Sequence, residues 1–268
     1  MSSTKGAGTD IDVIVVNYRT PTDLARFLES VELAAGDVEY RLHVANVCPT
    51  DADLKVVEQD GRAIHHVQFA DNVGYARAVN YCAARSDADV LGIFNADVTL
   101  SQDSLANCSS ALQSNDRWGV LSPLQVNLAH KITHAGIFGT NEAPRHRGWK
   151  EPCTPGRYDD IREDAVTLSG SALFVDRRCW DEMYACPVFE QAFPTAQGAF
   201  ILTPHYYEET GFIYHARHHG WKAVYYGQVR IIHEWHQASP VGGSADKKMK
   251  QSQQIFRSFM DAHGISRD

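Results

Sequence analysis

The sequence contains no apolar run long enough to cross a membrane and no excess of positive charge. A membrane-spanning helix needs about 20 mostly apolar residues in a row, so we expect no integral membrane segment. The chain carries 25 Lys and Arg against 33 Asp and Glu, a formal net charge of −8. This acidic balance argues against a nucleic-acid binder, which usually presents a basic face.

Two further absences narrow the chemistry. No G-x-G-x-x-G segment follows the first predicted strand, which disfavours a dinucleotide-dependent dehydrogenase. The six cysteines are scattered without a C-x-x-C pair. Their pattern is typical of reduced, buried thiols in a cytoplasmic protein, and less so of a disulfide framework or a zinc site. Residues 1–10 lack an apolar stretch, so we expect a flexible tail and not a signal peptide.

Strand and helix signals alternate through the first half of the chain. Alternation with short loops is typical of a parallel, doubly wound α/β sheet. With 268 residues, 44% of them hydrophobic, the chain can form one large domain or two small ones. Strands are predicted at residues 11–16, 39–47, 63–69, 90–94 and 119–122, and helices at 22–33, 51–59, 74–85 and 102–115.

The second half is less regular. Residues 140–164 form a loop rich in Pro, Arg and Gly, whose length favours a lid or a binding role. No linker divides the chain, so we predict a tail at 1–10, one domain at 11–240 and a helical extension at 241–268. Strands are predicted at 134–139, 166–175 and 223–232, and helices at 177–184, 208–219 and 246–263.

Polar loops follow four of the predicted strands. Ligands bind outside the carboxyl ends of the strands in open α/β sheets, so we expect these loops to meet at one edge. In the third loop we predict that Asn72 caps a helix, Gly74 admits a ligand and Arg77 pairs with phosphate oxygens. The candidate ligand-binding residues of the four loops are Asn17, Tyr18, Arg19, Asn46, Asn72, Gly74, Arg77, Asn95 and Asp97.

The fourth loop offers hard oxygen ligands. Asn95 and Asp97 end an apolar run and present an amide and a carboxylate, two residues apart. Mg²⁺ and Mn²⁺ prefer such ligands, and a cation there would hold a diphosphate. The alternative is that both residues only open a turn or cap the next helix. Taken alone, the turn is the commoner outcome.

Candidate acids and bases follow in the second half. Glu208 and Glu209 open a predicted helix, where the helix dipole alone favours acidic residues. A carboxylate is also a suitable base for group transfer to an alcohol. His233 ends the last predicted strand and offers a neutral imidazole as a third metal ligand. A zinc site of His233, Glu234 and His236 is excluded, because the His-Glu-x-x-His spacing is absent.

The order of these motifs resembles family 2 glycosyltransferases of the GT-A fold, especially their rhamnosyltransferase-like branch. The resemblance runs from about Ile11 to Ser239. Ala45 and Gly211 stand where the family usually has acids, and Asn95 replaces the first acid of its metal motif. The similar segments are Val16-Asn-Tyr18, Asn72-Val-Gly-Tyr-Ala76 with Asn80, Asn95-Ala-Asp97, His134-Ala-Gly136, Ser169-Gly-Ser-Ala172, Tyr207-Glu-Glu209 with Arg217, and His233 with Ser239.

The resemblance implies a mostly parallel, Rossmann-like central sheet flanked by helices, with a C-terminal helical tail. It implies an inverting enzyme that moves a sugar from a nucleotide-diphosphate-sugar donor to an acceptor hydroxyl on a glycan, a lipid-linked molecule or a protein. Mn²⁺ or Mg²⁺ would be the cofactor, with Asp97 and His233 as ligands and Asn95 assisting. Glu209 would be the catalytic base.

The resemblance also assigns the remaining candidates. Arg217 joins the donor-binding set named above for the four loops. Trp149, Gly170, Ser171 and Glu208 are expected at the acceptor or in a lid. Trp149, Trp221 and Trp235 offer flat apolar faces for sugar rings.

Two alternatives to this enzyme stay open. One is a non-catalytic relative that binds a carbohydrate or a nucleotide sugar. The other is a sugar-1-phosphate nucleotidyltransferase, which usually has a Gly-rich phosphate loop after its first strand, whereas residues 17–21 contain no glycine. The sequence leaves the sugar, the nucleotide, the acceptor and the oligomeric state open.

Overall fold

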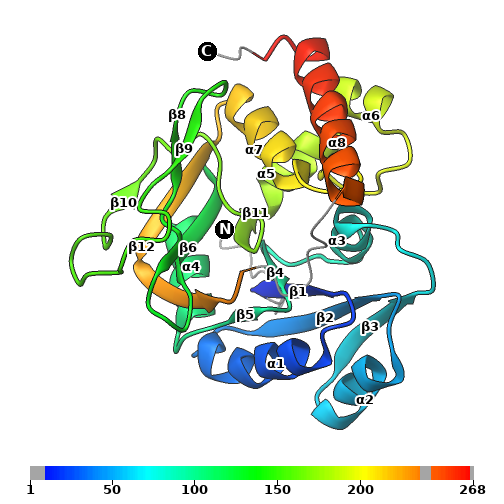
Figure 1. The fold of residues 1–268 in the computed structure, drawn as a ribbon, viewed down its shortest axis with the longest axis vertical. Helices are drawn as coiled ribbons and strands as arrows, with labels where there is room; N and C mark the ends of the chain where they lie inside the picture. Colours follow the sequence, from blue (N-terminus) through cyan, green and yellow to red (C-terminus); the bar gives the residue numbers. More distant parts are fainter. Residues whose placement is uncertain (1–9, 236–242, 266–268) are drawn as a thin grey trace, which may run out of the picture.

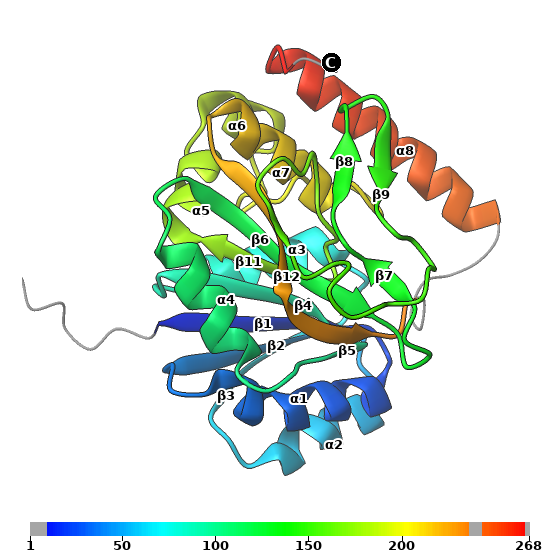
Figure 2. The same ribbon diagram turned by 90° about the vertical axis from the view of Figure 1, so that its left-hand side faces the viewer.

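The protein is described by a computed structural model over residues 10–235 and 243–265. Almost all of the predicted N-terminal tail, Ser239, His236 and the predicted boundary at 240/241 lie outside the described residues. One large twisted sheet forms the centre, with helices on both faces (Figures 1 and 2). No described helix is both long and apolar enough to cross a membrane.

The first half follows the predicted alternation and forms the parallel array β3-β2-β1-β4. Asn17 of β1 lies opposite Asn46 of β2, and Val16 lies opposite Asn95 of β4, so the polar strand ends share one edge. The elements are β1 (Ile11–Asn17), α1 (Pro21–Ala35), β2 (Tyr40–Val47), α2 (Asp51–Asp60), β3 (Ile64–Phe69), α3 (Tyr75–Ala83) and β4 (Val90–Asn95).

The second half extends the sheet to the order β10-β12-β6-β11-β4-β1-β2-β3, with β5 also paired to β12 and β7 to β6. The elements are β5 (Val98–Thr99), α4 (Ser104–Gln113), β6 (Trp118–Val126), β7 (Ile132–His134), β8 (Ile137–Gly139), β9 (Pro144–His146), β10 (Ile161–Arg162), β11 (Ala172–Asp176), α5 (Arg177–Tyr184), α6 (Pro187–Ala192), α7 (Glu208–His218), β12 (Lys222–His233) and α8 (Gly243–Ala262).

Strand β11 departs from the parallel sheet that the alternation predicts. It lies between β4 and β6 and runs antiparallel to both. All five of its residues are buried, and a strand buried on both faces is a continuous apolar run in either direction. Because its direction is reversed, the loop before β11 reaches the edge where β1, β2 and β4 end. The sheet as a whole is still mostly parallel, as expected.

The segments around the predicted loop also differ from expectation. The strand predicted at 134–139 is interrupted at Gly136, whose φ of +86° lies in the left-handed region. The strand predicted at 166–175 is regular only from Ala172. The loop predicted at 140–164 contains the short strands β9 and β10. These strands are too short to leave a periodic pattern in the sequence.

Two apolar cores fill the faces of the sheet. One lies beneath α3, α5 and α7, and the other beneath α1, α2 and α4. A third, smaller cluster joins α6, α7 and α8, so α8 lies against its neighbouring helices away from the sheet (Figure 1). Its members include Phe189, Phe193, Tyr214, Phe259 and Met260.

Asn80 of α3 clamps the segment that leads into α7. Its fully buried amide accepts a hydrogen bond from the backbone N–H of Phe200 at 3.1 Å and donates one to the Phe200 carbonyl at 3.0 Å. Gly198 is also required, because a Cβ there would lie 2.8 Å from Oδ1 of Asn80. These two hydrogen bonds explain why an asparagine, Asn80, accompanies the segment Asn72-Val-Gly-Tyr-Ala76 in the resemblance described above.

We expect Asn80→Ala to lower the free energy of unfolding by roughly 2–6 kcal/mol, because it leaves a buried N–H and a buried carbonyl unpaired at about 1–3 kcal/mol each. Urea unfolding measures the loss. Asn115→Ala is the matched control, since the Asn115 amide donates to the Ala111 carbonyl at a less buried position. Its cost should be about 1 kcal/mol or less. Equal losses in both variants would contradict the clamp.

Candidate functional site

Asp97 and His233 are brought together by backbone pairing. Strand β5, which follows Asp97, pairs with the end of β12, so Val98 lies opposite His233. The N–H of Glu234 donates to the Asp97 carbonyl at 3.1 Å. Oδ1 of Asp97 therefore lies 3.5 Å from Nε2 of His233, and the two side chains are only 10% and 6% exposed. A carboxylate oxygen and an imidazole nitrogen thus lie side by side in a nearly buried position.

Asn95 lies at the same edge. It is the last residue of β4, and its N–H donates to the Ser171 carbonyl at 2.9 Å. A turn at residues 96–97 connects β4 to β5, so Asn95 and Asp97 do flank a turn. They do not cap the next helix, because α4 begins after Asp103. Asn95 and Asp97 therefore lie together at the carboxyl end of β4, where the sequence predicted a pair of oxygen ligands.

The carboxylate of Asp23 lies within electrostatic range of the Asp97 and Glu234 carboxylates. Burial raises the pKa of Asp23 above its ordinary value; Arg26, 2.8 Å away, opposes this, and the negative charges of Asp97 and Glu234 add to it. Carboxylates that repel one another in a partly dry place favour a cation between them. This edge of the sheet is therefore suited electrostatically to a divalent ion.

The two glutamates at the start of α7 follow a strained turn. Tyr206 and Tyr207 have φ angles of 65° and 71°, a left-handed conformation that costs non-glycine residues of order 1 kcal/mol or more. The hydroxyl of Thr203 donates to the Tyr206 carbonyl at 2.8 Å. Glu208 is buried and Glu209 half-buried, and burial raises the pKa of both carboxyls. Strain of this kind accumulates at functional sites.

Gly170 and Tyr75 connect Glu209 to the Asp97 edge. A Cβ on Gly170 would lie 3.0 Å from Cγ and Cδ of Glu209, so a larger residue there would push the Glu209 side chain out of its present position by a few tenths of an ångström. The Tyr75 hydroxyl donates to the Gly170 carbonyl at 2.8 Å. Burial raises the pKa of Tyr75, and the charges of Glu209, Glu208 and Asp97 add to the shift. The Tyr75 ring therefore lies within electrostatic reach of both acidic groups.

Tyr75 is a candidate site residue that no pattern in the sequence singles out. Its position inside Asn72-Val-Gly-Tyr-Ala76 is the available signal, but an aromatic residue after a loop is usually part of a core. Only the contact with Gly170, far along the chain, reveals its position.

Asn17 and Asn46 have no exposed surface. Nδ2 of Asn17 donates to Oδ1 of Asn46 and to Oδ1 of Asp53, both at 2.8 Å. Nδ2 of Asn46 lies 3.0 Å from Nε2 of His66. These side chains therefore brace the loops after β1 and β2 from inside the protein.

The other loop residues lie at the surface. Tyr18 and Arg19 are exposed, and Nε of Arg19 donates to the Cys48 carbonyl at 3.0 Å. Oδ1 of Asn72 accepts from the N–H of Gly74 at 3.1 Å, so Asn72 forms a turn, and the predicted cap is wrong because Gly74 is itself the N-cap of α3. Arg77 is exposed on α3.

The side chains of Arg217 and Ser171 already form hydrogen bonds with other groups of this protein. The guanidinium of Arg217 donates to Oδ1 of Asn141 at 2.8 Å and to the Val166 carbonyl at 3.1 Å. It lies eight residues after Glu209, about 12 Å further along α7. Ser171 is buried, and its hydroxyl donates to Oε1 of Gln125 at 2.7 Å. Arg217 therefore anchors the segment after β8, and Ser171 fixes the loop next to Asn95.

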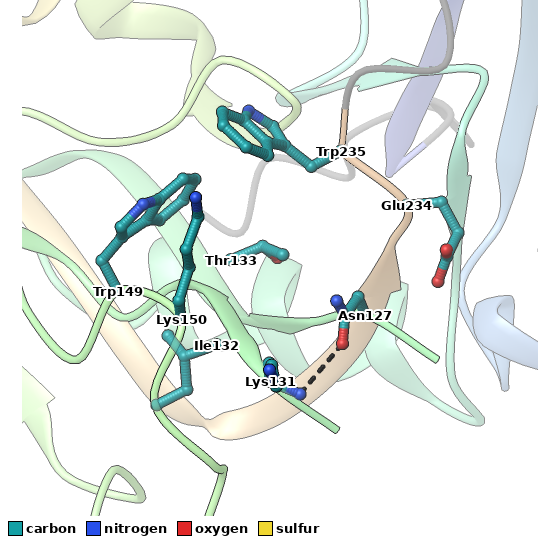
Figure 3. Close-up of a pocket in the computed structure, with 8 residues that line it drawn as sticks. All are labelled: Asn127, Lys131, Ile132, Thr133, Trp149, Lys150, Glu234 and Trp235. Carbon is teal, nitrogen blue, oxygen red and sulfur yellow. Dashed lines mark hydrogen bonds between the residues drawn. The ribbon is translucent and has the colours of Figure 1, made fainter. Parts of the chain in front are cut away.

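A pocket of about 220 Å³ adjoins His233 through the next two residues, Glu234 and Trp235. Figure 3 shows the indole rings of Trp149 and Trp235 on one side of it, with Lys150 beside them. The two rings are perpendicular at 4.7 Å, and Nζ of Lys150 lies 5.4 Å from the Trp235 ring. The remaining lining residues are Asn127, Lys131, Ile132 and Thr133.

Trp221 is not part of this pocket. It is 7% exposed, and its indole N–H donates to Glu182 at 2.9 Å. The expectation that it offers a face to a sugar is therefore wrong.

His134 lies close enough to His233 for the two charges to interact, and burial lowers the pKa of His134 to about 3. A neutral imidazole thus lies near the Asp97–His233 pair.

Residues 12–129 match the family model of glycosyl transferase family 2. The structure is similar to mannosyltransferase PcManGT from Pyrobaculum calidifontis in complex with GDP-Man and Mn²⁺, with a TM-score of 0.59 and 14% identity over 96% of this chain and 71% of that one. It is also similar to GalNAc-T7 with UDP, GalNAc and Mn²⁺, with a TM-score of 0.60 and 15% identity over 96% of this chain and 57% of that one. None of the curated proteins matches the sequence significantly.

These findings confirm two expectations. The resemblance to family 2 is confirmed over residues 12–129, and the GT-A architecture is confirmed by likeness to two glycosyltransferase structures. The chain spans little more than half of GalNAc-T7.

The buried Glu208 gives the protein a testable pH dependence. Because its pKa is raised in the folded state, the unfolded chain loses this proton first as the pH rises above about 4.5. Stability therefore falls with pH from there until the folded-state pKa is passed. Burial raises the folded-state pKa of Glu208 to about 8, so we expect Glu208→Gln to remove this loss of stability, because glutamine has no proton to lose in this pH range.

Thermal unfolding at pH 5 and pH 8, with a chelator present, measures this effect. The Tm of Glu208→Gln should gain on that of the unsubstituted protein as the pH rises. Glu142→Gln, at an exposed position, should change neither value. A Glu208→Gln difference that is the same at both pH values would contradict the raised pKa.

Proposed function

We propose that this protein, which has the GT-A fold and matches family 2 over residues 12–129, is an inverting glycosyltransferase. It moves a sugar, of the hexosyl or rhamnosyl type, from a nucleotide-diphosphate-sugar donor to a hydroxyl of a glycan, a lipid-linked acceptor or a protein. The observation that carries the proposal is the Asp97–His233 pair, 3.5 Å apart at the sheet edge to which Tyr75 and Gly170 connect Glu209.

The residues present suit a divalent cation. Asp97 supplies a hard carboxylate oxygen, His233 an imidazole nitrogen and Asn95 an amide oxygen, a combination that Mn²⁺ accepts and Mg²⁺ tolerates. The surrounding charges of Asp23 and Glu234 favour the same ion. When bound, the cation would supply positive charge to the leaving diphosphate. Mn²⁺ accompanies the nucleotide ligands named for both similar structures.

Glu209 is the proposed base. The acceptor oxygen forms a bond to the anomeric carbon while the bond from that carbon to the diphosphate oxygen breaks, so the configuration inverts. The acceptor proton passes to the Glu209 carboxylate, whose raised pKa makes it a stronger base than an exposed glutamate. Gly170 leaves room for this carboxylate, and Tyr75 holds Gly170. The more buried Glu208 supports its neighbour.

Donor recognition is proposed at the exposed residues of the loops. Tyr18, Arg19 and Arg77 offer a ring and two guanidinium groups, and the Gly74 backbone leaves room for a phosphate next to Asn72. Asn17 and Asn46 contribute by holding the loops from inside. The Ser171 carbonyl holds the fourth loop by accepting a hydrogen bond from the Asn95 N–H. Arg217 contributes by anchoring residues 141 and 166 through hydrogen bonds.

The pocket of Trp149 and Trp235 is the proposed acceptor subsite. Indole faces suit the apolar faces of sugar rings, and a few polar groups fix orientation in such pockets. Lys150 and Asn127 offer those groups here. The pocket follows His233 directly, so an acceptor bound there would lie beside the proposed metal site.

The absence of a later acid in α7 has a structural cause. A Cβ at Gly211 would lie 2.3 Å from Cδ1 of Ile201, so an acid at this position would have to displace the Ile201 side chain. The departure from the family pattern is thus tied to the packing of Ile201. A non-catalytic relative stays the alternative that the kinetic experiment below addresses.

The metal assignment predicts that Asp97→Ala loses Mn²⁺-dependent nucleotide binding while the fold stays intact. Adding Mn²⁺ with GDP or UDP should raise the Tm of the unsubstituted protein by mass action. The rise should vanish in Asp97→Ala and remain in the exposed control Asp116→Asn. A rise of equal size in Asp97→Ala would rule out this metal site.

The base assignment predicts that Glu209→Gln slows transfer by about 10²–10⁴-fold, the usual contribution of a general base, with donor affinity nearly unchanged. Glu208→Gln should slow it less. Release of nucleoside diphosphate, with water or a screened alcohol as acceptor, measures both. If Glu208→Gln is the inactive variant, the two roles are exchanged. Donor binding without turnover in the unsubstituted protein would favour the non-catalytic alternative.

A further inference from the structure

A second group of metal-ligating side chains lies where α6, α7 and α8 meet. Cys186 directly precedes α6, His215 lies in the last turn of α7, His219 is the C-cap of that helix, and His263 directly follows α8. One ligand atom from each of the four lies within 4.8 Å of every other. None of these residues belongs to the site proposed above.

Cys186 and His215 of this group are buried, and His219 and His263 are half-buried. His215 has no exposed surface, and neither of its ring nitrogens has a hydrogen-bond partner among the described residues; the same holds for Nε2 of His263. An unpaired buried polar atom costs about 1–3 kcal/mol. These three nitrogen atoms therefore have no hydrogen bond that the binding of an ion would have to break.

We propose that Cys186, His215, His219 and His263 bind one Zn²⁺ in a tetrahedral structural site. A thiolate with three neutral imidazoles is a ligand set that binds Zn²⁺ in preference to Mn²⁺ or Mg²⁺. Zn–N bonds of about 2.0–2.1 Å and a Zn–S bond of about 2.3 Å imply ligand atoms roughly 3.3–3.6 Å apart. The four atoms therefore need to close by about an ångström, and the Cys186 thiol gives up its proton to solvent.

A carboxylate supports one of the ligands. Oε1 of Glu182 lies 3.4 Å from Nδ1 of His219, and Oε2 of Glu182 accepts from the indole N–H of Trp221 at 2.9 Å. A ligating histidine commonly gives its second nitrogen to such a carboxylate, which fixes the ring orientation. Nε2 of His219 is therefore the atom that we expect to bind. The His219 side chain is 32% exposed, which provides an entry path for the ion.

The zinc would fasten α8 to the rest of the protein. Its ligands come from the segment before α6, from α7 and from the end of α8, and the small apolar cluster of the same helices surrounds them. Figure 1 places α8 beside α6 and α7, away from the central sheet. A zinc ion there would add a cross-link to the apolar contacts that Phe259 and Met260 of α8 already make.

The test uses the full chain, stripped with a chelator, desalted and then given ZnCl₂. We expect about one tightly held zinc per chain by elemental analysis, together with a higher Tm. Cys186→Ser and His263→Ala should each lose the zinc and the Tm rise. The controls Cys153→Ser and His218→Ala, the latter an exposed neighbour on the same helix, should keep both.

Two further measurements separate this site from the proposed transferase site. Asp97→Ala should retain the zinc, and the zinc-site variants should retain Mn²⁺-dependent nucleotide binding. If the variants fail to fold, Co²⁺ added to the unsubstituted protein should give a thiolate-to-cobalt charge-transfer band. The proposal is overturned if that band is absent, if the unsubstituted protein holds no zinc, or if the double variant Cys186→Ser/His263→Ala holds as much.

Discussion

The candidate transferase site depends on the pairing of β5 with the last residues of β12. These segments are distant in the chain, and their pairing brings a carboxylate and an imidazole within 3.5 Å in a nearly closed place. Asp97 by itself is a turn residue, and His233 by itself is one of 13 histidines. The hydrogen bond from Glu234 to the Asp97 carbonyl fixes the register, because a shift by one residue would turn His233 to the other face of the sheet.

The reversed strand β11 supplies the second constraint. Its direction brings Gly170 to the carboxyl edge of the parallel strands, where the absence of a side chain gives Glu209 its place and the carbonyl receives the Tyr75 hydroxyl. The left-handed pair before α7 and the buried acids cost free energy there. The Asn80 clamp and the apolar core beneath α7 hold this strained segment in position.

The two proposed metal sites differ in ligand chemistry in the way their roles require. At the sheet edge, oxygen ligands with one imidazole suit an ion that a diphosphate shares and that exchanges with the donor. At the helix junction, a thiolate with imidazoles suits an ion that stays. Helix α7 runs from the proposed transferase site to the proposed zinc site, since its first turn carries the proposed base Glu209, its last turn carries His215 and its C-cap is His219.

The sequence by itself determined the elements and the polar strand ends of the first half, because apolar periodicity and punctuation by Asn, Asp and Gly are local properties. It also singled out Asp97, His233 and Glu209 through the order of motifs. Only the tertiary structure decided the direction of β11, because a doubly buried strand has the same composition either way. Tertiary structure also turned Asn17 and Asn46 inward and brought Tyr75 to Gly170. A polar side chain does not indicate in sequence whether its partner will be a ligand or another side chain. The proposed zinc ligands Cys186 and His263 give no signal in the sequence for the same reason, since only the packing of α6, α7 and α8 brings them together.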